Sequence, residues 1–548
     1  MSFHALARPH CRHRGDPWIL PVARRADRTE TGRPLAPEIL RGRVTRSSDQ
    51  PQGAPRQKGG SGAIGGGLWT MLERVLSQGT QLVIFVVAAH LLSPAEFGVF
   101  ALVSACAILM LRVSEASWAP YIMSWSGDAK VPRQVVMVSI WSGLALAAAG
   151  ALGALALPLF GADAATSQLV ALFSAWVFLA TVSSAQKGML IWQGGLRASA
   201  LCEILGDLIG MAVAVAALYA GWGVFALAFG RLAFQATHLV LSFAFTRSAP
   251  LPGMRGAALA DLWAYTRQSF TSRMIANIRL YVATFLIGGF LGPAAVGYYR
   301  AAQRLVGSVA EVIGQPALIL AWNLFRRARD AAPGTAPGTA GFQAVARVFF
   351  PALLAISVPV FIWLVLMGED LIKGLLGPTW LPALPVVAVL ALSRGIAALG
   401  VATEPVLSLA GEIRRMPLFS LLFLIATVAL TLLAAPFGLM AVAWAQAAVA
   451  AVMMGASMVL MQRHGGIDWR GVGAVSWRLI APMLVGSAML LWVRDWAIFA
   501  SAPPLARAFA ALIPALPVYL LALALALPDL RVLARARLAR LRGPALDA

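Results

Sequence analysis

Charge is the scarcest property of this sequence. Only 12% of its 548 residues are Asp, Glu, Lys or Arg, whereas 59% are hydrophobic. A water-soluble protein of this length needs far more charged surface, so the composition excludes an ordinary soluble enzyme or binding module. It indicates a polytopic membrane protein, in which apolar side chains face lipid.

Residues that commonly build catalytic or metal sites are also rare. The three cysteines, Cys11, Cys106 and Cys202, lie far apart without metal-ligand spacing, and the six histidines are scattered. No GxxxxGK[ST] or HExxH pattern occurs. The connections between apolar segments are too short for the catalytic loop that a membrane-embedded polysaccharide ligase or glycosyltransferase usually needs. We therefore predict no catalytic residue, metal or cofactor, and a protein that is not an enzyme.

Apolar segments of roughly 20 residues, the length that crosses a bilayer, follow one another from residue 67 onward. They predict an all-α fold with about fourteen transmembrane helices. The predicted spans are 67–91, 98–123, 134–159, 168–189, 201–220, 223–246, 268–290, 297–323, 347–367, 384–409, 417–435, 438–461, 479–493 and 506–528.

The basic residues fall on one side of these spans. Of the 44 Lys and Arg, 33 lie in the two tails and in the even-numbered connections. This count places Lys187 with the connection that follows the fourth span. Three lie on the other side, and these are Lys373, Arg494 and Arg507. Positive residues stay on the cytoplasmic side of a membrane, so both termini are predicted to be cytoplasmic. The same distribution explains the net charge of +21 without a nucleic-acid partner.

The spans also predict how the chain is divided. Residues 1–66 hold 12 Lys and Arg against 5 acidic residues, with many Pro and Gly, which indicates a disordered basic tail. An N-terminal lobe at 67–246, a cytoplasmic linker at 247–267 and a C-terminal lobe at 268–461 follow. An extra pair of spans at 462–528 precedes a basic tail at 529–548.

A short motif repeats after the first and seventh spans. Leu92-Ser-Pro-Ala-Glu-Phe-Gly-Val99 and Leu291-Gly-Pro-Ala-Ala-Val-Gly-Tyr298 share four of eight residues at an offset of 199. The proline fixes φ in a turn, and the glycine begins the next helix where chains crowd. The same offset relates Arg74 to Arg273 and Arg112 to Glu311. Two pseudo-repeated units of six helices are therefore predicted, related by an axis along the membrane normal.

These two motifs, with LLGPTWLPALPVVAVLAL at 375–392, resemble the polysaccharide-transporter branch of the multidrug/oligosaccharidyl-lipid/polysaccharide exporter superfamily. The resemblance covers about residues 67–460. It implies two six-helix lobes around a central cavity that opens alternately to each side of a bacterial inner membrane. It implies that the cargo is an undecaprenyl-pyrophosphate-linked oligosaccharide for O-antigen, capsule or exopolysaccharide synthesis. The implied partners are membrane lipids, a polysaccharide polymerase and chain-length machinery.

Charged residues within the spans are the candidate site. Arg300, Arg304 and Glu311 stand at i, i+4 and i+11, within about 40° of one another around a helix. The deep positions hold a net positive charge, which suits an anionic cargo because guanidinium groups donate in a fork that matches phosphate oxygens. A cavity for cationic drugs should instead be acidic and lined by aromatic rings. The deep residues are Arg112, Arg231, Arg279, Arg304 and Arg394 against Glu115 and Glu311.

We predict that Arg279 and Arg304 hold the pyrophosphate, aided by Arg273, Arg74, Arg231 and Arg300. Glu311 or Glu115, buried in a span, would take up a proton or a cation and so drive transport. Simpler explanations stay open: Arg304 and Glu311 could form interhelical ion pairs, while Arg74 and Arg300 could reach toward the membrane interface. The alternative functions are a lipid II flippase, a multidrug antiporter and a membrane-embedded polysaccharide ligase or glycosyltransferase.

Overall fold

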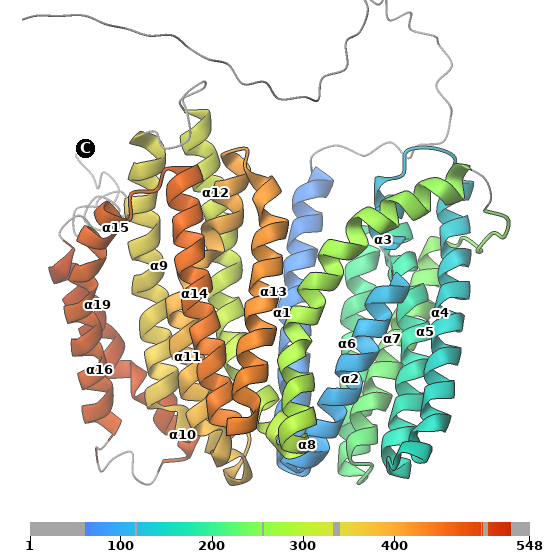
Figure 1. Ribbon diagram of the computed structural model, residues 1–548, viewed down its shortest axis with the longest axis horizontal. Coiled ribbons are helices and arrows are strands. Elements are labelled where there is room, and N and C mark those ends of the chain that lie inside the picture. The colour runs from blue at the N-terminus through green and yellow to red at the C-terminus, as the bar shows by residue number, and fades with distance from the viewer. Residues whose placement is uncertain are drawn as a thin grey trace, which may run out of the picture. The chain divides into compact units, whose positions relative to one another are not determined.

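The computed structural model describes residues 61–115, 118–254, 257–331, 340–494, 496 and 502–527, and nearly all of them are helical (Figure 1). It leaves out the side chains of some helical residues, among them Glu115 and Arg273. The predicted tails lie outside these residues, except that the first helix already begins at Ser61. The predicted all-α class is confirmed.

The helices follow the predicted spans closely. The first half of the chain forms α1 (Ser61–Leu91), α2 (Pro94–Glu115), α3 (Trp118–Ser124), α4 (Lys130–Ala156), α5 (Ala164–Trp192), α6 (Leu196–Tyr219) and α7 (Val224–Thr246). A long bent helix, α8 (Ala257–Asp330), comes next. The second half forms α9 (Ala340–Leu366), α10 (Gly368–Leu375), α11 (Leu384–Ala397), α12 (Thr403–Leu409), α13 (Met416–Ala434), α14 (Leu439–Gly465), α15 (Trp469–Ser476), α16 (Ile480–Arg494), α18 (Pro504–Ala510) and α19 (Leu512–Ala526).

The described residues contain enough apolar helix for fourteen membrane crossings. Thirteen helical stretches are long and apolar enough to cross a bilayer. One of them, Asn277–Asp330, reverses direction at Gly292, whose φ of 80° is a conformation that glycine adopts without steric cost. Its two halves supply the seventh and eighth crossings. The chain expected to be a linker at 247–267 is already helical from Ala257, because α8 extends the seventh span.

The helix ends define two faces. We call the end that holds the Pro-Gly turns at 92–98 and 291–297 the turn face. We call the opposite end, where most of the connecting Lys and Arg lie, the basic face. The basic face includes Lys130, Arg133, Arg197, Arg247, Arg326, Arg414 and Arg463.

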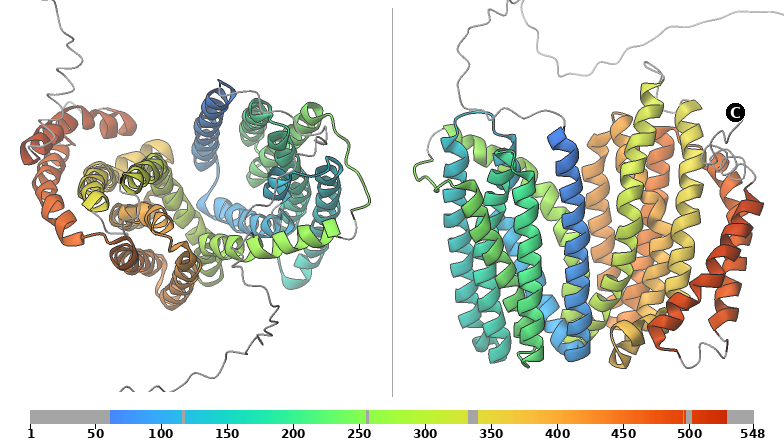
Figure 2. Two further views of the ribbon diagram at one scale, coloured as in Figure 1. Left: turned by 90° about the horizontal axis from the view of Figure 1, so that it is seen from above. Right: turned by 180° about the vertical axis from the view of Figure 1, so that it is seen from behind.

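The helices pack as two groups, which Figure 2 shows from above. In the first lobe α6 packs along α7, α4 along α5, and α1 against α6. In the second lobe α9 and α14 pack on α11, and α13 packs on both α14 and α8. Helix α8 contributes to both lobes. Its residue Leu262 is buried with Tyr121 and Val135 of the first lobe, and its Phe325 is buried with Phe349 of the second.

The two repeated turns pack directly on each other. A Cβ atom on Gly98 would lie 1.8 Å from the carbonyl oxygen of Pro293, and one on Gly297 would lie 1.9 Å from that of Pro94. The backbone of each motif therefore packs directly against the glycine of the other motif, where only a residue without a side chain fits. The contact is reciprocal, as a pseudo-twofold axis between repeats requires. It joins α2 to α8 at the turn face.

One tryptophan strengthens this closure. Trp380, in the short turn Pro378–Ala383 before α11, is fully buried and donates its indole N–H to the carbonyl oxygen of Ala89 at 2.8 Å. Its ring stacks edge-on against Phe97 at 5.6 Å and against Tyr298 at 6.1 Å between centroids. The second lobe thus anchors a side chain in the first lobe at the turn face.

Ion pairs between side chains hold the extra helix pair to the second lobe. Arg507 on α18 donates from Nη2 to Asp370 Oδ1 on α10 at 2.5 Å, and Asp370 is buried. Glu369 pairs with Lys373 at 2.6 Å and with Arg494 at 3.8 Å. The hydrogen bond from Lys373 and the nearby positive charges lower the pKa of Glu369. All three basic residues predicted on the side poor in positive charge are therefore paired with carboxylates.

Candidate functional site: two arginine-lined cavities

A cavity of about 410 Å³ opens in the first lobe against α8. Helices α1, α2, α6 and α7 supply most of its walls, and α8 supplies Arg300 and Arg304. The third cation, Arg231 on α7, is held by aromatic rings: its guanidinium carbon lies 5.8 Å from the Phe100 centroid and 5.7 Å from that of Trp176. Such cation–π contacts stabilise a desolvated guanidinium by roughly 0.5–2 kcal/mol and leave its hydrogen-bond donors available.

Arg231 lies close enough to both Arg300 and Arg304 for their positive charges to repel its own. Arg304 donates from Nη2 to the Gln81 amide oxygen at 3.3 Å, and Arg300 donates from Nη1 to the Gln303 amide oxygen at 3.2 Å. Both partners are neutral amides. Among the described side chains, none of the three arginines forms an ion pair with a carboxylate, although Glu311 attracts Arg304 at longer range.

A second cavity of about 460 Å³ lies in the second lobe. Arg279 on α8 and Arg394 on α11 both line it and are near enough to repel each other. The Arg279 guanidinium stacks on Phe423 of α13, with its central carbon 4.2 Å from the ring centroid. Glu404 on α12 lines the same cavity. Its other walls alternate apolar rings with amides and hydroxyls, and Gln446 donates to the Thr431 hydroxyl at 2.6 Å.

Helix α8 forms the wall between the two cavities. Gln303 lines the second cavity and accepts from Arg300, which lines the first. Gln303 also donates to the hydroxyl of the fully buried Tyr299 at 3.0 Å. The turn at Gly292 places this half of α8 between the lobes, so that its successive faces meet different cavities. One helix thus presents cations to both lobes.

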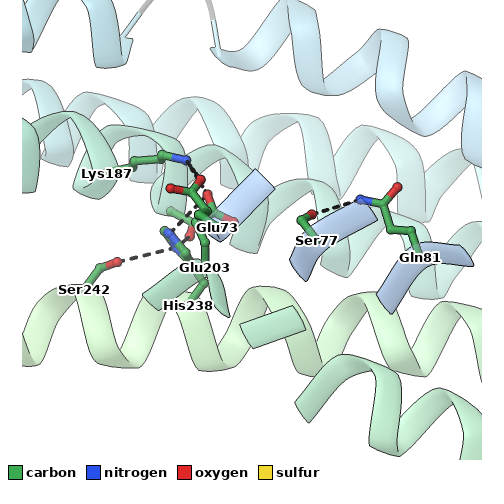
Figure 3. A network of polar contacts seen from close by, with 8 residues as sticks. Glu73, Ser77, Gln81, Lys187, Glu203, His238 and Ser242 are labelled. Carbon is green, nitrogen blue, oxygen red and sulfur yellow. Dashed lines mark hydrogen bonds and ion pairs between the residues drawn. The ribbon is translucent and has the colours of Figure 1, made fainter. Parts of the chain in front are cut away.

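A network of carboxylates extends from the first cavity toward the basic face (Figure 3). Lys187 on α5 donates to Glu203 Oε1 on α6 at 2.5 Å and lies 3.5 Å from Glu73 Oε1 on α1. His238 on α7 places its Nε2 atom 3.6 Å from Glu203 and bonds to Ser183 through Nδ1. Four helices of the first lobe therefore meet at one ionic cluster.

Polar side chains continue this network along α1. Ser77 and Gln81 follow Glu73 at successive intervals of four residues, which places all three on one helical face. Gln81 donates to the Ser77 hydroxyl at 3.2 Å and accepts from Arg304 of α8. Asp207 on α6 lines the same cavity and lies within hydrogen-bonding reach of Ser77. A chain of hydrogen bonds therefore runs from Arg304 through Gln81 to Ser77, which lies one helical turn from Glu73.

The structure brings four of the predicted arginines to the cavities and separates them. Arg231, Arg300 and Arg304 line the first cavity, while Arg279 lines the second. The predicted pairing of Arg279 with Arg304 around one phosphate group therefore does not fit this geometry. Arg74 is exposed on α1 and lines neither cavity.

The predicted coupling carboxylate Glu311 lines neither of the two cavities. Glu311 is exposed rather than buried, since it lies where α8 has passed beyond the first cavity. The side chains of Glu115 and Arg273 lie outside the described part of the structure, so their predicted roles stay predictions. Among the described residues, no group of His, Cys, Asp and Glu could hold a metal ion.

Sequence reasoning passed over the residues of the carboxylate network. Lys187 falls inside the predicted span 168–189 but counts with the basic residues of the following connection, and α5, which continues to Trp192, keeps it well within the helix. Glu203 and Asp207 had an ordinary explanation as acidic residues near the start of a helix. The signal available was the pair of carboxylates four residues apart inside an apolar span, with a lysine in the preceding one.

Comparison with known proteins agrees with this architecture. A family model described as polysaccharide biosynthesis protein matches residues 87–385. The structure titled lipid II flippase MurJ, inward closed conformation, has a TM-score of 0.65 at 12% identity and covers 85% of this chain and 99% of its own. An inward-facing multidrug resistance MATE family transporter of the MOP superfamily has a TM-score of 0.55 at 13% identity, covering 70% and 94%.

These identities establish a common fold, and no curated protein matches the chain. The family match is of a different kind, since it spans more than half of the sequence. It includes both repeated turns and the half of α8 that carries Arg300 and Arg304. The chain therefore belongs to the polysaccharide biosynthesis protein family of membrane proteins, on the fold shared by MurJ and the MATE transporters.

Proposed function

We propose that this protein flips a polyprenyl-pyrophosphate-linked oligosaccharide across a bacterial inner membrane by alternating access. The undecaprenyl carrier is the form that the sequence resemblance implies. The basic face would lie in the cytoplasm, with both termini, and the turn face in the periplasm. This assignment follows the distribution of Lys and Arg around the spans. The family match and the fold support a transporter of polysaccharide precursors.

The arginine cluster of the first cavity carries the proposal. Three guanidinium groups in one cavity at membrane depth are costly, because each such charge costs roughly 2.5–3.5 kcal/mol on insertion scales. An anionic ligand would offset that cost and use the forked donors that guanidinium groups present. A pyrophosphate headgroup has the required charge and oxygen geometry. A cationic drug would meet repulsion from Arg231, Arg300 and Arg304 instead.

The closed turn face supports a direction for the cycle. In this state the reciprocal glycine contacts and Trp380 join the lobes at the turn face. Cargo would therefore enter from the basic face and bind Arg304 and Arg231 beside α1. Release would follow when the α2–α8 contact separates. The lipid tail would stay between helices in the bilayer, since it gains nothing from entering a charged cavity.

For energy coupling we propose the network around Lys187. A proton or cation that neutralised Glu203 or Glu73 would release Lys187 and loosen the contact of α1 with α5 and α6. Because Gln81 joins α1 to Arg304, that movement would reach the anion site directly. Glu311 and Glu115 remain the coupling residues predicted from the sequence, and substitution of each separates the two possibilities.

The proposal predicts that Arg304→Ala and Arg231→Ala will lower flipping by about 10- to 100-fold, since each removes a charge-assisted contact of roughly 1.5–3 kcal/mol. The control is Arg463→Ala, which removes an exposed arginine at the basic face. Lipid-linked oligosaccharide is measured on each side of vesicles from a strain depleted of the protein. All variants are scored for membrane insertion.

Three results would contradict the proposed function. Vesicles without the protein could flip their sugar lipids at the normal rate, or both arginine variants could export polymer normally. Movement of lipid II without movement of the polysaccharide precursor would favour the lipid II flippase. Drug efflux that survives Arg304→Ala would favour the multidrug antiporter.

A further inference from the structure

The second cavity contains a pair of arginines that lies outside the cluster of Arg231, Arg300 and Arg304. Arg279 and Arg394 line it together and repel each other. Among the described side chains, neither forms an ion pair with a carboxylate. Arg394 is exposed to the cavity, and Arg279 is held by the face of Phe423 rather than by an acid. The two neighbouring guanidinium groups carry one more charge than Glu404, which lines the same cavity, so the site can accept an anion.

The geometry of α8 separates this site from the arginine cluster of the first cavity. Gln303 and the fully buried Tyr299 lie in the wall between Arg300 and the second cavity. A pyrophosphate is compact, because one bridging oxygen joins its two phosphates. It cannot occupy both cavities. A cargo that fills both cavities would therefore place another of its groups at Arg279 and Arg394.

The lining of the second cavity suits a sugar. Met416 and Phe419 supply apolar surface, and Gln446 supplies an amide group. Sugar rings present C–H faces and hydroxyl edges, so they match this alternation of apolar and hydrogen-bonding groups. Glu404 can accept hydrogen bonds from sugar hydroxyls in the same cavity. The volume of about 460 Å³ lies within the range of small-ligand pockets.

We propose that the second cavity is a glycan subsite and that the transported oligosaccharide is acidic. Arg279 and Arg394 bind a carboxylate carried by a sugar, such as that of a uronic acid. The pyrophosphate of the same molecule binds Arg231, Arg300 and Arg304 on the other side of α8. This inference rests on the proposed function and specifies its substrate class.

The test uses the full-length protein in proteoliposomes and two synthetic polyprenyl-pyrophosphate disaccharides. The two lipids are identical except that the terminal sugar is glucuronic acid in one and glucose in the other. We expect the wild type to flip the acidic lipid at least about tenfold faster, the rate ratio that one charge-assisted contact supplies. Arg394→Gln should reduce this preference to within about twofold.

Two further variants give the control. Arg304→Gln should slow both lipids by the same factor, because both carry the pyrophosphate. Arg394→Lys keeps the charge and should retain most of the preference for the acidic lipid. Thermal denaturation of each purified variant in detergent shows whether it is folded.

Equal wild-type rates for the two lipids would overturn the acidic-glycan inference and leave the proposed function standing. So would a preference that survives in both Arg394→Gln and Arg279→Gln, since it would place the sugar carboxylate elsewhere. If wild type flips neither lipid, the proposed function itself fails, and the inference fails with it.

Discussion

At the scale of single residues, the cavities are defined by which partner each arginine has. Arg507 has the carboxylate of Asp370, and it holds two helices together. Arg231 and Arg279 have aromatic rings, and Arg300 and Arg304 have amides. An arginine paired with a carboxylate is neutralised, whereas one held by a ring or an amide keeps its charge for a ligand. The same residue type is therefore structural at one position and available for binding at another.

Lys187 gives a test at this scale. Lys187→Met leaves Glu73 and Glu203 facing each other without a cation, and we expect a loss of about 1–3 kcal/mol in the free energy of unfolding. We expect the lower end of this energy range, because a third of the lysine side chain is exposed and water screens its ion pair with Glu203. Thermal denaturation of the purified protein in detergent measures the change.

The matched control for Lys187 restores the charge balance. Lys187→Met combined with Glu203→Gln removes one charge of each sign and should recover part of the lost stability. If the double variant is no more stable than the single one, Lys187 does not act through Glu203. Lys187→Arg keeps the cation and should lose least.

At the scale of helices, the sequence predicted where each span lies but not which faces meet. Hydropathy located all fourteen crossings, because lipid requires an uninterrupted apolar stretch in every one of them. The repeat offset of 199 predicted two equivalent units, and the contacts of Gly98 and Gly297 across the interface confirm their equivalence. The neighbours of Lys187 and the separation of Arg279 from Arg304 depend on helix rotation and on the turn at Gly292. Neither can be read from one helix alone.

The paired turns predict a strict requirement for glycine. Gly297→Ala places a methyl group against the carbonyl oxygen of Pro94, where the space is 1.9 Å. We expect α2 and α8 to separate at the turn face and flipping to fall. A cysteine introduced at Phe97 should then react faster with a polar thiol reagent added from the turn face. The matched control is Gly289→Ala on the same helix, because no atom lies within 4 Å of the added methyl. Equal labelling of both variants would contradict this prediction.

The ion pair between Arg507 of α18 and Asp370 of α10 allows a test of how the extra helix pair is attached. Arg507→Ala leaves the buried Asp370 carboxylate without its partner, so we expect α18 and α19 to become sensitive to protease, with Arg507→Lys intermediate. Acid should act in the same direction. Because the pKa of Glu369 is lowered in the folded protein, its stabilising contribution is present above its unfolded pKa and is lost as pH falls through the folded value. Limited proteolysis at a series of acidic pH values measures the protease sensitivity caused by the substitution and that caused by acid. A helix pair that stays protected in Arg507→Ala would show that apolar packing alone holds it.

At the scale of the whole described molecule, two sets of contacts compete to set its state. The turn face holds the lobes together through the glycine contacts and the Trp380 hydrogen bond. Charge repulsion among the arginines favours separation around the cavities until an anion is bound. A ligand shifts such an equilibrium only by its differential affinity for the two states. The cargo would therefore act by neutralising Arg231, Arg300 and Arg304, which removes the repulsion, and the lobes could then rearrange around it.

Trp380 provides the test of this balance. Trp380→Phe keeps an aromatic ring against Phe97 and Tyr298 but removes the N–H that donates to Ala89. The loss of a buried hydrogen bond, about 1 kcal/mol, should shift the equilibrium roughly fivefold toward the state open at the turn face. Accessibility of a cysteine at Gln81, measured from each side of the membrane in a background without native cysteines, should rise from the turn face and fall from the basic face. Adding the lipid-linked substrate should shift wild type and variant in the same direction. If accessibility from the basic face is unchanged, Trp380 is a packing residue, and the glycine contacts alone keep the turn face closed.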